Sequence, residues 1–267
     1  PGVFEYQLGA LAEYLYQLRK SRDRVENLPA EYRPEDLPAA YRIQEALAAR
    51  RLEGAKARTT GYKIACTSQH AQDILDVDQP LYGRVLSSAL YEEPALLPAA
   101  DFRVRCIEPE FGFRIATDVP PGEAPYDRES IARYIDAALP SLEIVDHRFE
   151  DWSVVGAPVL VADNSINAAW VHGDPETRWQ HVALAEQDVL LRVNGNRVRT
   201  GRGERVLGHP LTALAWLANE LPSYGQQLRA GDYVTTGVCT DVYFAEPGDE
   251  LEARFGPLGS VRLTFER

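Results

Sequence analysis

The 267-residue sequence contains no methionine and only three cysteines, Cys66, Cys106 and Cys239. These cysteines lie far apart and cannot all pair, so we expect a reducing, cytoplasmic setting rather than a disulfide framework. No apolar run approaches the roughly 18 residues that cross a bilayer. The N-terminus also lacks the basic and apolar segments of a secretory signal, so we expect neither a membrane protein nor a secreted one.

Positive charge is also scarce. The 28 Lys and Arg residues face 40 Asp and Glu residues, which gives a formal net charge of −12 at pH 7. Nonspecific binding to nucleic acid or to an anionic membrane requires clustered Lys and Arg, so both are excluded as expected partners. A hydrophobic content of 45% argues against general disorder. The length fits one large domain, or one domain with a small appendage.

The N-terminal region has helical periodicity. Leucines at positions 8, 11, 15 and 18 recur at three- and four-residue steps and predict one helix. The connector 27–38 holds three prolines. Asp36 is the expected N-cap of a second helix. We expect residues 1–58 to be a helical segment that packs on a catalytic, β-rich domain of residues 59–267.

After Gly61 the pattern changes to short alternating strands separated by Gly, Pro and Asp. Asn194-Gly195 predicts a tight hairpin, and two helices are expected, at Arg128–Leu139 and from Pro210 onward. The expected strands are Tyr62–Cys66, Arg103–Ile115, Ala183–Val193, Asn196–Thr200, Asp232–Thr235, Asp241–Ala245, Glu250–Phe255 and Ser260–Phe265. Together they predict an α+β fold built on a curled, mainly antiparallel sheet.

Three carboxylates and one lysine could carry chemistry. Glu108 and Glu110 are two apart on a predicted strand and therefore share a face, where they could hold a divalent cation or simply meet solvent. Glu143 lies in an apolar run, so its partner is either an ion or a basic side chain. Lys63, in an apolar strand, either reaches the surface or points into a polar site. His209 precedes Pro210 and fits a helix neighbour better than a base.

Seven short motifs occur together in one order and spacing, and in this the sequence resembles the hydratase/decarboxylase family. That family, which includes 2-keto-4-pentenoate hydratase and 4-oxalocrotonate decarboxylase, is part of the fumarylacetoacetate hydrolase superfamily. The likeness extends from about Ala39 to Phe265. The motifs are G-Y-K-I at 61–64, V-D-Q-P-L-Y-G at 77–83, I-E-P-E at 107–110, L-P-S-L-E-I-V at 139–145, V-A-D-N at 161–164, L-G-H-P-L at 207–211 and T-G at 236–237.

The resemblance implies a fold, a site and a reaction. The fold is the β-roll of the fumarylacetoacetate hydrolase C-terminal domain, and family members of this kind are expected to be homo-oligomers. The implied site has Mg²⁺ or Mn²⁺ held by Glu108, Glu110 and Glu143, with Lys63 as the catalytic lysine. The implied substrate is a small 2-oxo or 2-hydroxydienoic acid. The residues expected to contact that substrate are Leu81, Asp163, His209, Thr236 and Gly237.

Some positions depart from the hydratase pattern. Many hydratases carry an acidic residue where this chain has Leu81, and decarboxylases of the family carry an aliphatic one. The segments 148–152 and 201–203 look more like hydratases, whereas Ala65-Cys66 replaces the usual Gly-Leu. We predict hydration of a 2-hydroxy-2,4-dienoate to a 4-hydroxy-2-oxo acid. The alternatives are decarboxylation of a 2-oxo-hexenedioate, C–C bond hydrolysis of an acylpyruvate, and a non-catalytic family member.

Overall fold

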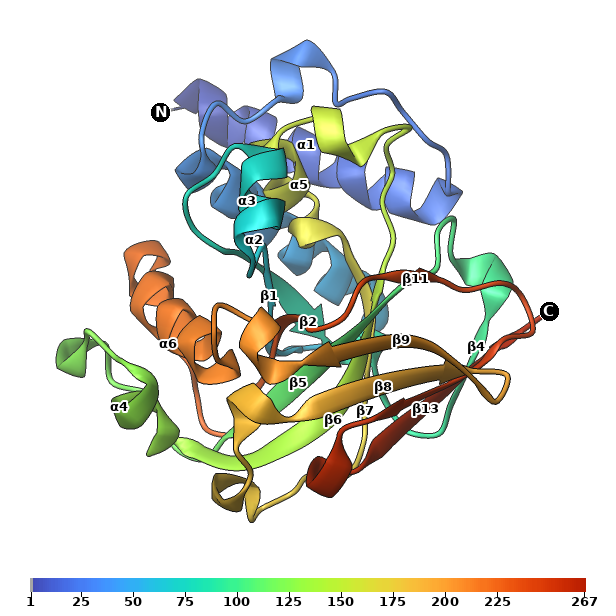
Figure 1. The fold of residues 1–267 in the computed structure, drawn as a ribbon. Helices are drawn as coiled ribbons and strands as arrows, with labels where there is room; N and C mark the ends of the chain where they lie inside the picture. Colours follow the sequence, from blue (N-terminus) through green and yellow to red (C-terminus); the bar gives the residue numbers. More distant parts are fainter. Residues whose placement is uncertain (1) are drawn as a thin grey trace.

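The computed structural model describes residues 2–267 and begins with two packed helices (Figure 1). The helices are α1 (Gly2–Ser21) and α2 (Leu37–Ala55). The Asp36 side chain accepts a hydrogen bond from the Ala39 N–H, which confirms the predicted N-cap. Pro1, the first residue of the predicted helical segment, lies outside the described residues. No helix in residues 2–267 is long and apolar enough to cross a membrane.

The larger sheet holds the elements that matter for function. Its strand order is β2-β1-β10-β5-β6-β7-β3, and β11 pairs with β5. The β1–β10 and β3–β7 pairs are parallel and the other pairs are antiparallel, so the sheet is mixed but mainly antiparallel, as predicted. The strands are β1 (Thr59–Ala65), β2 (Leu81–Leu86), β3 (Leu90–Glu92), β5 (Cys106–Ile115), β6 (Ile135–Val145), β7 (Asn167–His172), β10 (Tyr233–Val238) and β11 (Tyr243–Phe244).

A smaller sheet with the order β4-β13-β12-β8-β9 packs against the larger one. The rings of Phe111 and Phe255 meet edge to face across the two sheets, with centroids 5.1 Å apart. The β8–β9 hairpin turns at Asn194-Gly195, where both residues have positive φ, as predicted. The strands are β4 (Ala95–Pro98), β8 (Asp188–Val193), β9 (Asn196–Arg202), β12 (Glu250–Arg254) and β13 (Ser260–Glu266).

Residues 2–267 contain four further α-helices: α3 (Gln69–Leu75), α4 (Arg128–Ala132), α5 (Ala157–Ala162) and α6 (Pro210–Glu220). Helix α5 packs on α2, and α6 packs on β10 and β1 (Figure 1). Leu15 of α1 and Ile43 of α2 belong to the same buried apolar cluster as Phe265 near the C-terminus. The N-terminal helices are therefore part of the common core, and a boundary at residue 58 stays a prediction.

The predicted helix Arg128–Leu139 is wrong beyond its first turn. Helix α4 ends at Ala132, and the long strand β6 begins at Ile135 and continues through Pro140. A short apolar run does not distinguish a buried helix from a fully buried strand, and every residue of β6 after Asp136 is buried. Pro140 is tolerated because the β7 ladder already ends at the Ser141–His172 pair. The predicted strand 183–193 likewise starts later, at Asp188.

Candidate metal centre and active site

Three glutamates converge because of the register between β5 and β6. Glu108 lies directly opposite Glu143, and Glu110 lies opposite Ser141. Alternation along β5 puts Glu108 and Glu110 on one face, and directly paired residues of antiparallel strands also share a face. One carboxylate oxygen from each glutamate lies within 4.8 Å of the other two.

In both Glu110 and Glu143, one carboxylate oxygen accepts hydrogen bonds and the other accepts none from the described residues. Glu110 Oε1 accepts from the Thr235 hydroxyl at 2.6 Å and from the Gly237 N–H at 3.0 Å. Glu143 Oε2 accepts from the Asn167 amide at 2.7 Å. Glu110 Oε2 and Glu143 Oε1 are buried and have no hydrogen-bond partner among the described residues. Buried unpaired carboxylate oxygens are costly, which points to a cationic ligand.

Electrostatics lead to the same conclusion. Burial and the nearby Glu143 raise the pKa of Glu108 to about 8, and the same causes hold the pKa of Glu110 well above its usual range. The cluster therefore repels itself when fully ionised. Three carboxylates against one lysine leave a net charge of −2, and hard divalent cations prefer oxygen ligands. The residues thus fit a divalent metal ion.

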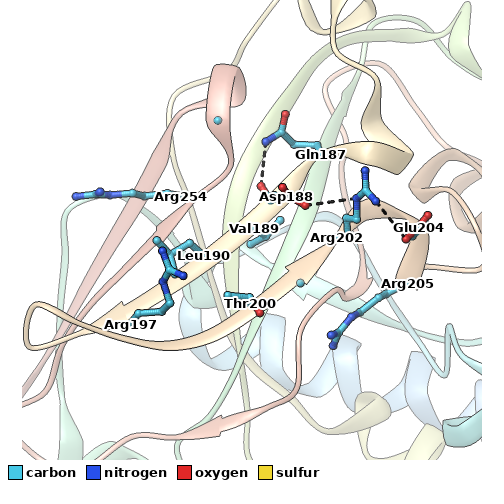
Figure 2. Close-up of a pocket in the computed structure, with 12 residues that line it drawn as sticks. Gln187, Asp188, Val189, Leu190, Arg197, Thr200, Arg202, Glu204, Arg205 and Arg254 are labelled. Carbon is cyan, nitrogen blue, oxygen red and sulfur yellow. Dashed lines mark hydrogen bonds and ion pairs between the residues drawn. The ribbon is translucent and has the colours of Figure 1, made fainter.

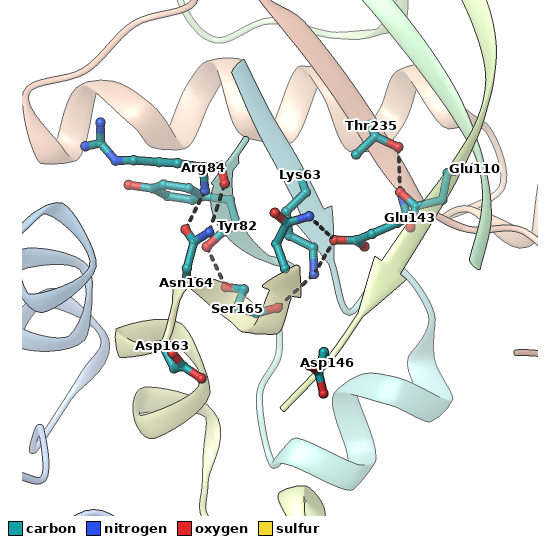
Figure 3. A network of polar contacts seen from close by, with 12 residues as sticks. Lys63, Tyr82, Arg84, Glu110, Glu143, Asp146, Asp163, Asn164, Ser165 and Thr235 are labelled. Atoms are coloured by element: carbon teal, nitrogen blue, oxygen red, sulfur yellow. Dashed lines mark hydrogen bonds and ion pairs between the residues drawn. The ribbon is translucent and has the colours of Figure 1, made fainter. Parts of the chain in front are cut away.

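Lys63 is buried in the middle of the sheet, with 2% of its surface exposed, so it does not reach the surface. Its Nζ donates to the Ser165 carbonyl at 2.8 Å and lies 3.3 Å from Glu143 Oε2 (Figure 3). Although burial opposes it, the surrounding glutamates, Glu143 first, raise the pKa of Lys63. The ammonium group contacts the Glu143 oxygen that Asn167 already binds, so it leaves Oε1 open to a metal.

A left-handed turn after α5 positions Ser165, which binds Lys63, and Asn167, which binds Glu143. Asn164, Ser165 and Ile166 have φ values of 58°, 48° and 56°. Positive φ is unusual for non-glycine residues and is unfavourable for a β-branched one such as Ile166. The turn is held because the Asn164 side chain bonds both backbone groups of Arg84. The strained turn brings the Ser165 carbonyl to Lys63 and starts β7 with Asn167 beside Glu143.

The structure places Leu81 on the same side of the sheet as the lysine. In the β1–β2 pair, Gly83 is opposite Lys63 and Leu81 is opposite Ala65, so all four share a face. Leu81 is 2% exposed. It therefore supplies an apolar wall beside the lysine strand, and its contact with substrate stays a prediction.

The β10 residues divide between the two faces of the sheet. Gly237 donates to Glu110, and its φ of 100°, with the Thr67 hydroxyl where a Cβ would be, admits only glycine. The Thr236 hydroxyl instead donates to the Phe111 carbonyl. The neighbouring Thr235 is the residue that reaches Glu110. Sequence reasoning missed Thr235, although strand alternation places it on the face of Gly237.

Asp163 and His209 have structural partners. Asp163 is fully buried between Arg19 and Arg148, and although burial acts to raise its pKa, the two guanidinium groups hold that pKa below its usual range. His209 is the N-cap of α6, where its Nδ1 accepts from the Leu211 N–H at 3.0 Å. That position agrees with the helix-neighbour interpretation, and contact of either residue with substrate stays a prediction.

A separate hollow of about 640 Å³ lies along the β8–β9 hairpin (Figure 2). It is rich in arginine, but Arg202 is paired with Asp188 and Glu204 at 3.4 and 3.6 Å. None of the three clustered glutamates lines it, and neither does Lys63. The glutamate cluster is therefore the better candidate for a reaction centre.

Comparison with known proteins identifies the family of the chain. Residues 66–266 match the model of the fumarylacetoacetate hydrolase C-terminal family. The chain belongs to this family. The match includes Glu108, Glu110 and Glu143 but begins after Lys63, which lies in the preceding strand.

Individual relatives include hydratases and a decarboxylase. The chain is 32% identical to 2-keto-4-pentenoate hydratase of Paraburkholderia xenovorans over 78% of its length and 77% of the relative. It is 33% identical to 2-hydroxyhexa-2,4-dienoate hydratase of Comamonas testosteroni over 78% of both chains. Among solved structures it resembles 4-oxalocrotonate decarboxylase of Pseudomonas putida G7, complexed with magnesium and adipate, at a TM-score of 0.89, 27% identity and 98% of both chains. The last match includes the N-terminal helices.

Asn167→Ala tests how Glu143 is oriented. The substitution removes the amide that holds Oε2, so Glu143 is free to turn away from the other two carboxylates. We expect Mg²⁺ to bind roughly 10- to 100-fold more weakly, the range for partners that orient metal ligands. Isothermal titration calorimetry with Mg²⁺ measures this. The exposed Asn196→Ala is the matched control, and an unchanged Mg²⁺ affinity in Asn167→Ala would exclude the orienting role.

Proposed function

We propose that the protein is a Mg²⁺- or Mn²⁺-dependent lyase that adds water to a 2-hydroxy-2,4-dienoate and yields a 4-hydroxy-2-oxo acid. The observation that carries this proposal is the convergence of Glu108, Glu110 and Glu143 beside the buried Lys63. Two hydratases that are 32% and 33% identical to the chain over 78% of its length support the same reaction class.

Each residue has a defined part in this proposal. Glu108, Glu110 and Glu143 would hold the metal ion through one oxygen each. When bound, such an ion supplies Lewis-acid chemistry to the oxygens of a 2-oxo acid. Lys63, which contacts Ser165 and Glu143, would offset the negative charge of the substrate carboxylate and would move a proton through its Nζ. Burial of this group excludes competing water from the ammonium.

Turnover of 2-hydroxypenta-2,4-dienoate tests the proposal. With Mg²⁺ present, we expect the dienol absorbance to fall and a product heavier by one water to accumulate, as followed by mass spectrometry. Chelation of the metal should abolish the reaction. A protein that binds Mg²⁺ at the glutamates but leaves this dienoate and its hexadienoate homologue unchanged would contradict hydration.

Decarboxylation is the second candidate, and Leu81 favours it together with the likeness to 4-oxalocrotonate decarboxylase. An aliphatic side chain beside Lys63 supplies no acid or base for adding water, whereas loss of CO₂ needs none at that position. Release of CO₂ from a 2-oxo-hexenedioate, with no product of hydration, would establish this activity instead.

We also propose that residues 1–58 form a helical segment on a catalytic domain of residues 59–267, and that the enzyme is a cytoplasmic homo-oligomer. The three cysteines are free in the structure, which is compatible with a reducing compartment. Helix α1 joins the rest of the chain through Arg19, whose guanidinium binds Asp163 and the Asn167 carbonyl.

A further inference from the structure

A second polar cavity lies where the C-terminal end of α1 meets α2 and the end of β6. Its volume is about 230 Å³. The lining holds five cationic side chains and only two acidic ones. In a chain with a net charge of −12, such a local excess of positive charge is unexpected. The cationic residues are Arg19, Lys20, Arg51, Arg103 and Arg148.

The acidic residues beside the cavity do not balance this charge. Asp146 accepts hydrogen bonds from the backbone N–H groups of Arg103 and Val104, and no arginine side chain of the lining pairs with its carboxylate among the described residues. Asp101 is half exposed and pairs with Arg22, which lies outside the lining, at 2.8 Å. Asp163 beneath the cavity pairs with Arg19 and Arg148 and attracts Arg51 and Arg103 at longer range, so one carboxylate serves four arginines. The arginine charges therefore exceed what the neighbouring carboxylates can neutralise.

Two of the arginines have donors without a partner. Arg51 makes no hydrogen bond or ion pair among the described residues, and its surface is only partly exposed. Burial lowers its pKa to about 10, and burial together with Arg148 lowers the pKa of Arg19 to about 9. Arg103 Nε is buried and has no hydrogen-bond partner. Arginine stays protonated at pH 7 in such surroundings, so these donors are suited to an anionic acceptor.

From this geometry we propose that the cavity binds a small, multiply charged oxyanion, of which inorganic phosphate is the simplest example. Arg51 and Arg103 donate to the anion, and Arg19 and Arg148 form the charged floor. The site also connects to the glutamate cluster. Arg19 binds the Asn167 carbonyl at 3.1 Å, and the Asn167 amide holds Glu143. Binding of the anion therefore stabilises the junction between α1 and the start of β7.

Phosphate titration of the full chain by isothermal titration calorimetry tests the proposal, with ionic strength kept constant by NaCl so that screening does not contribute. We expect saturable binding to the wild type. Arg51→Gln should weaken this binding about tenfold or more, because a charge-assisted donor is lost. Since Arg51 makes no internal hydrogen bond, the variant should fold and, without phosphate, unfold at the same or a higher temperature.

Two controls separate this site from others. Arg178→Gln removes an arginine that is 83% exposed outside the cavity, and it should leave the phosphate affinity unchanged. Glu110→Gln disables the proposed metal centre and should also leave the phosphate affinity unchanged. A failure of the lyase proposal therefore does not affect this test. The proposal is overturned by the absence of saturable binding, by equal affinity in Arg51→Gln, or by loss of binding in Glu110→Gln.

Discussion

Glu110→Gln is expected to abolish tight Mg²⁺ binding and to reduce kcat/KM by at least about 100-fold, since loss of a direct ligand should exceed the 10- to 100-fold effect of an orienting partner. The glutamine side-chain oxygen can still accept from Thr235 and Gly237, so the strand pairing should persist. What is lost is the charge and the free oxygen Oε2.

The same substitution should have opposite effects on stability with and without metal. Without metal, the variant loses a buried, mutually repelled carboxylate, so its free energy of unfolding should equal or exceed that of the wild type. With Mg²⁺, only the wild type should gain stability, because the ligand binds only the folded state. Thermal unfolding with EDTA and with Mg²⁺ measures both effects. Glu129→Gln, on the exposed surface of α4, is the control. If Mg²⁺ stabilised Glu110→Gln as much as Glu129→Gln, Glu110 would not be a metal ligand.

Lys63→Met is expected to lower kcat/KM by about 100-fold or more, the effect of losing a positioned proton donor or charge partner. In EDTA the variant should also lose about 3–5 kcal/mol of unfolding free energy. The reason is that a buried ion pair with Glu143 is broken and the three carboxylates lose the positive charge beside them. Methionine is unbranched, flexible and only one atom shorter than lysine, so packing changes little.

Saturating Mg²⁺ separates charge from packing in this variant. If the loss comes from unbalanced carboxylates, the metal should restore most of the stability but not the activity. Urea unfolding with and without Mg²⁺ measures the first, and the dienoate assay measures the second. Lys56→Met, at an exposed position after α2, is the control. Equal instability of Lys63→Met in EDTA and in Mg²⁺ would mean that Lys63 acts through packing alone.

The sequence could predict the part of the site that follows local rules. Strand alternation predicts that Glu108 and Glu110 share a face, and the apolar run around Glu143 marks it as a charge that needs a partner. For Lys63 the sequence leaves two placements open, at the surface or in a polar site, and the structure buries it. Family resemblance then joins the two stretches, which local periodicity cannot do. The structure supplies the β5–β6 register that sets Glu108 opposite Glu143.

The parts that escaped prediction depend on tertiary contacts. Ser165 acts through a carbonyl in a left-handed turn of non-glycine residues, which no local sequence rule indicates. The sequence around Asn167 indicates only a strand, and its bond to Glu143 depends on the pairing of β7 with β6. Pro140 resembles a helix terminator, yet it lies within β6, opposite Phe111 of β5. In each case a distant segment decides the role of the residue.

The pairing of β5 with β6 would also make the proposed cation a reporter of correct folding. A slip of one residue between these strands would turn one strand's acidic side chains to the opposite face and separate Glu143 from its two companions. Molecules trapped in such a shifted alignment would keep their secondary structure yet fail to take up the ion. Counting bound ions per chain after refolding would therefore measure the fraction that has reached the native alignment.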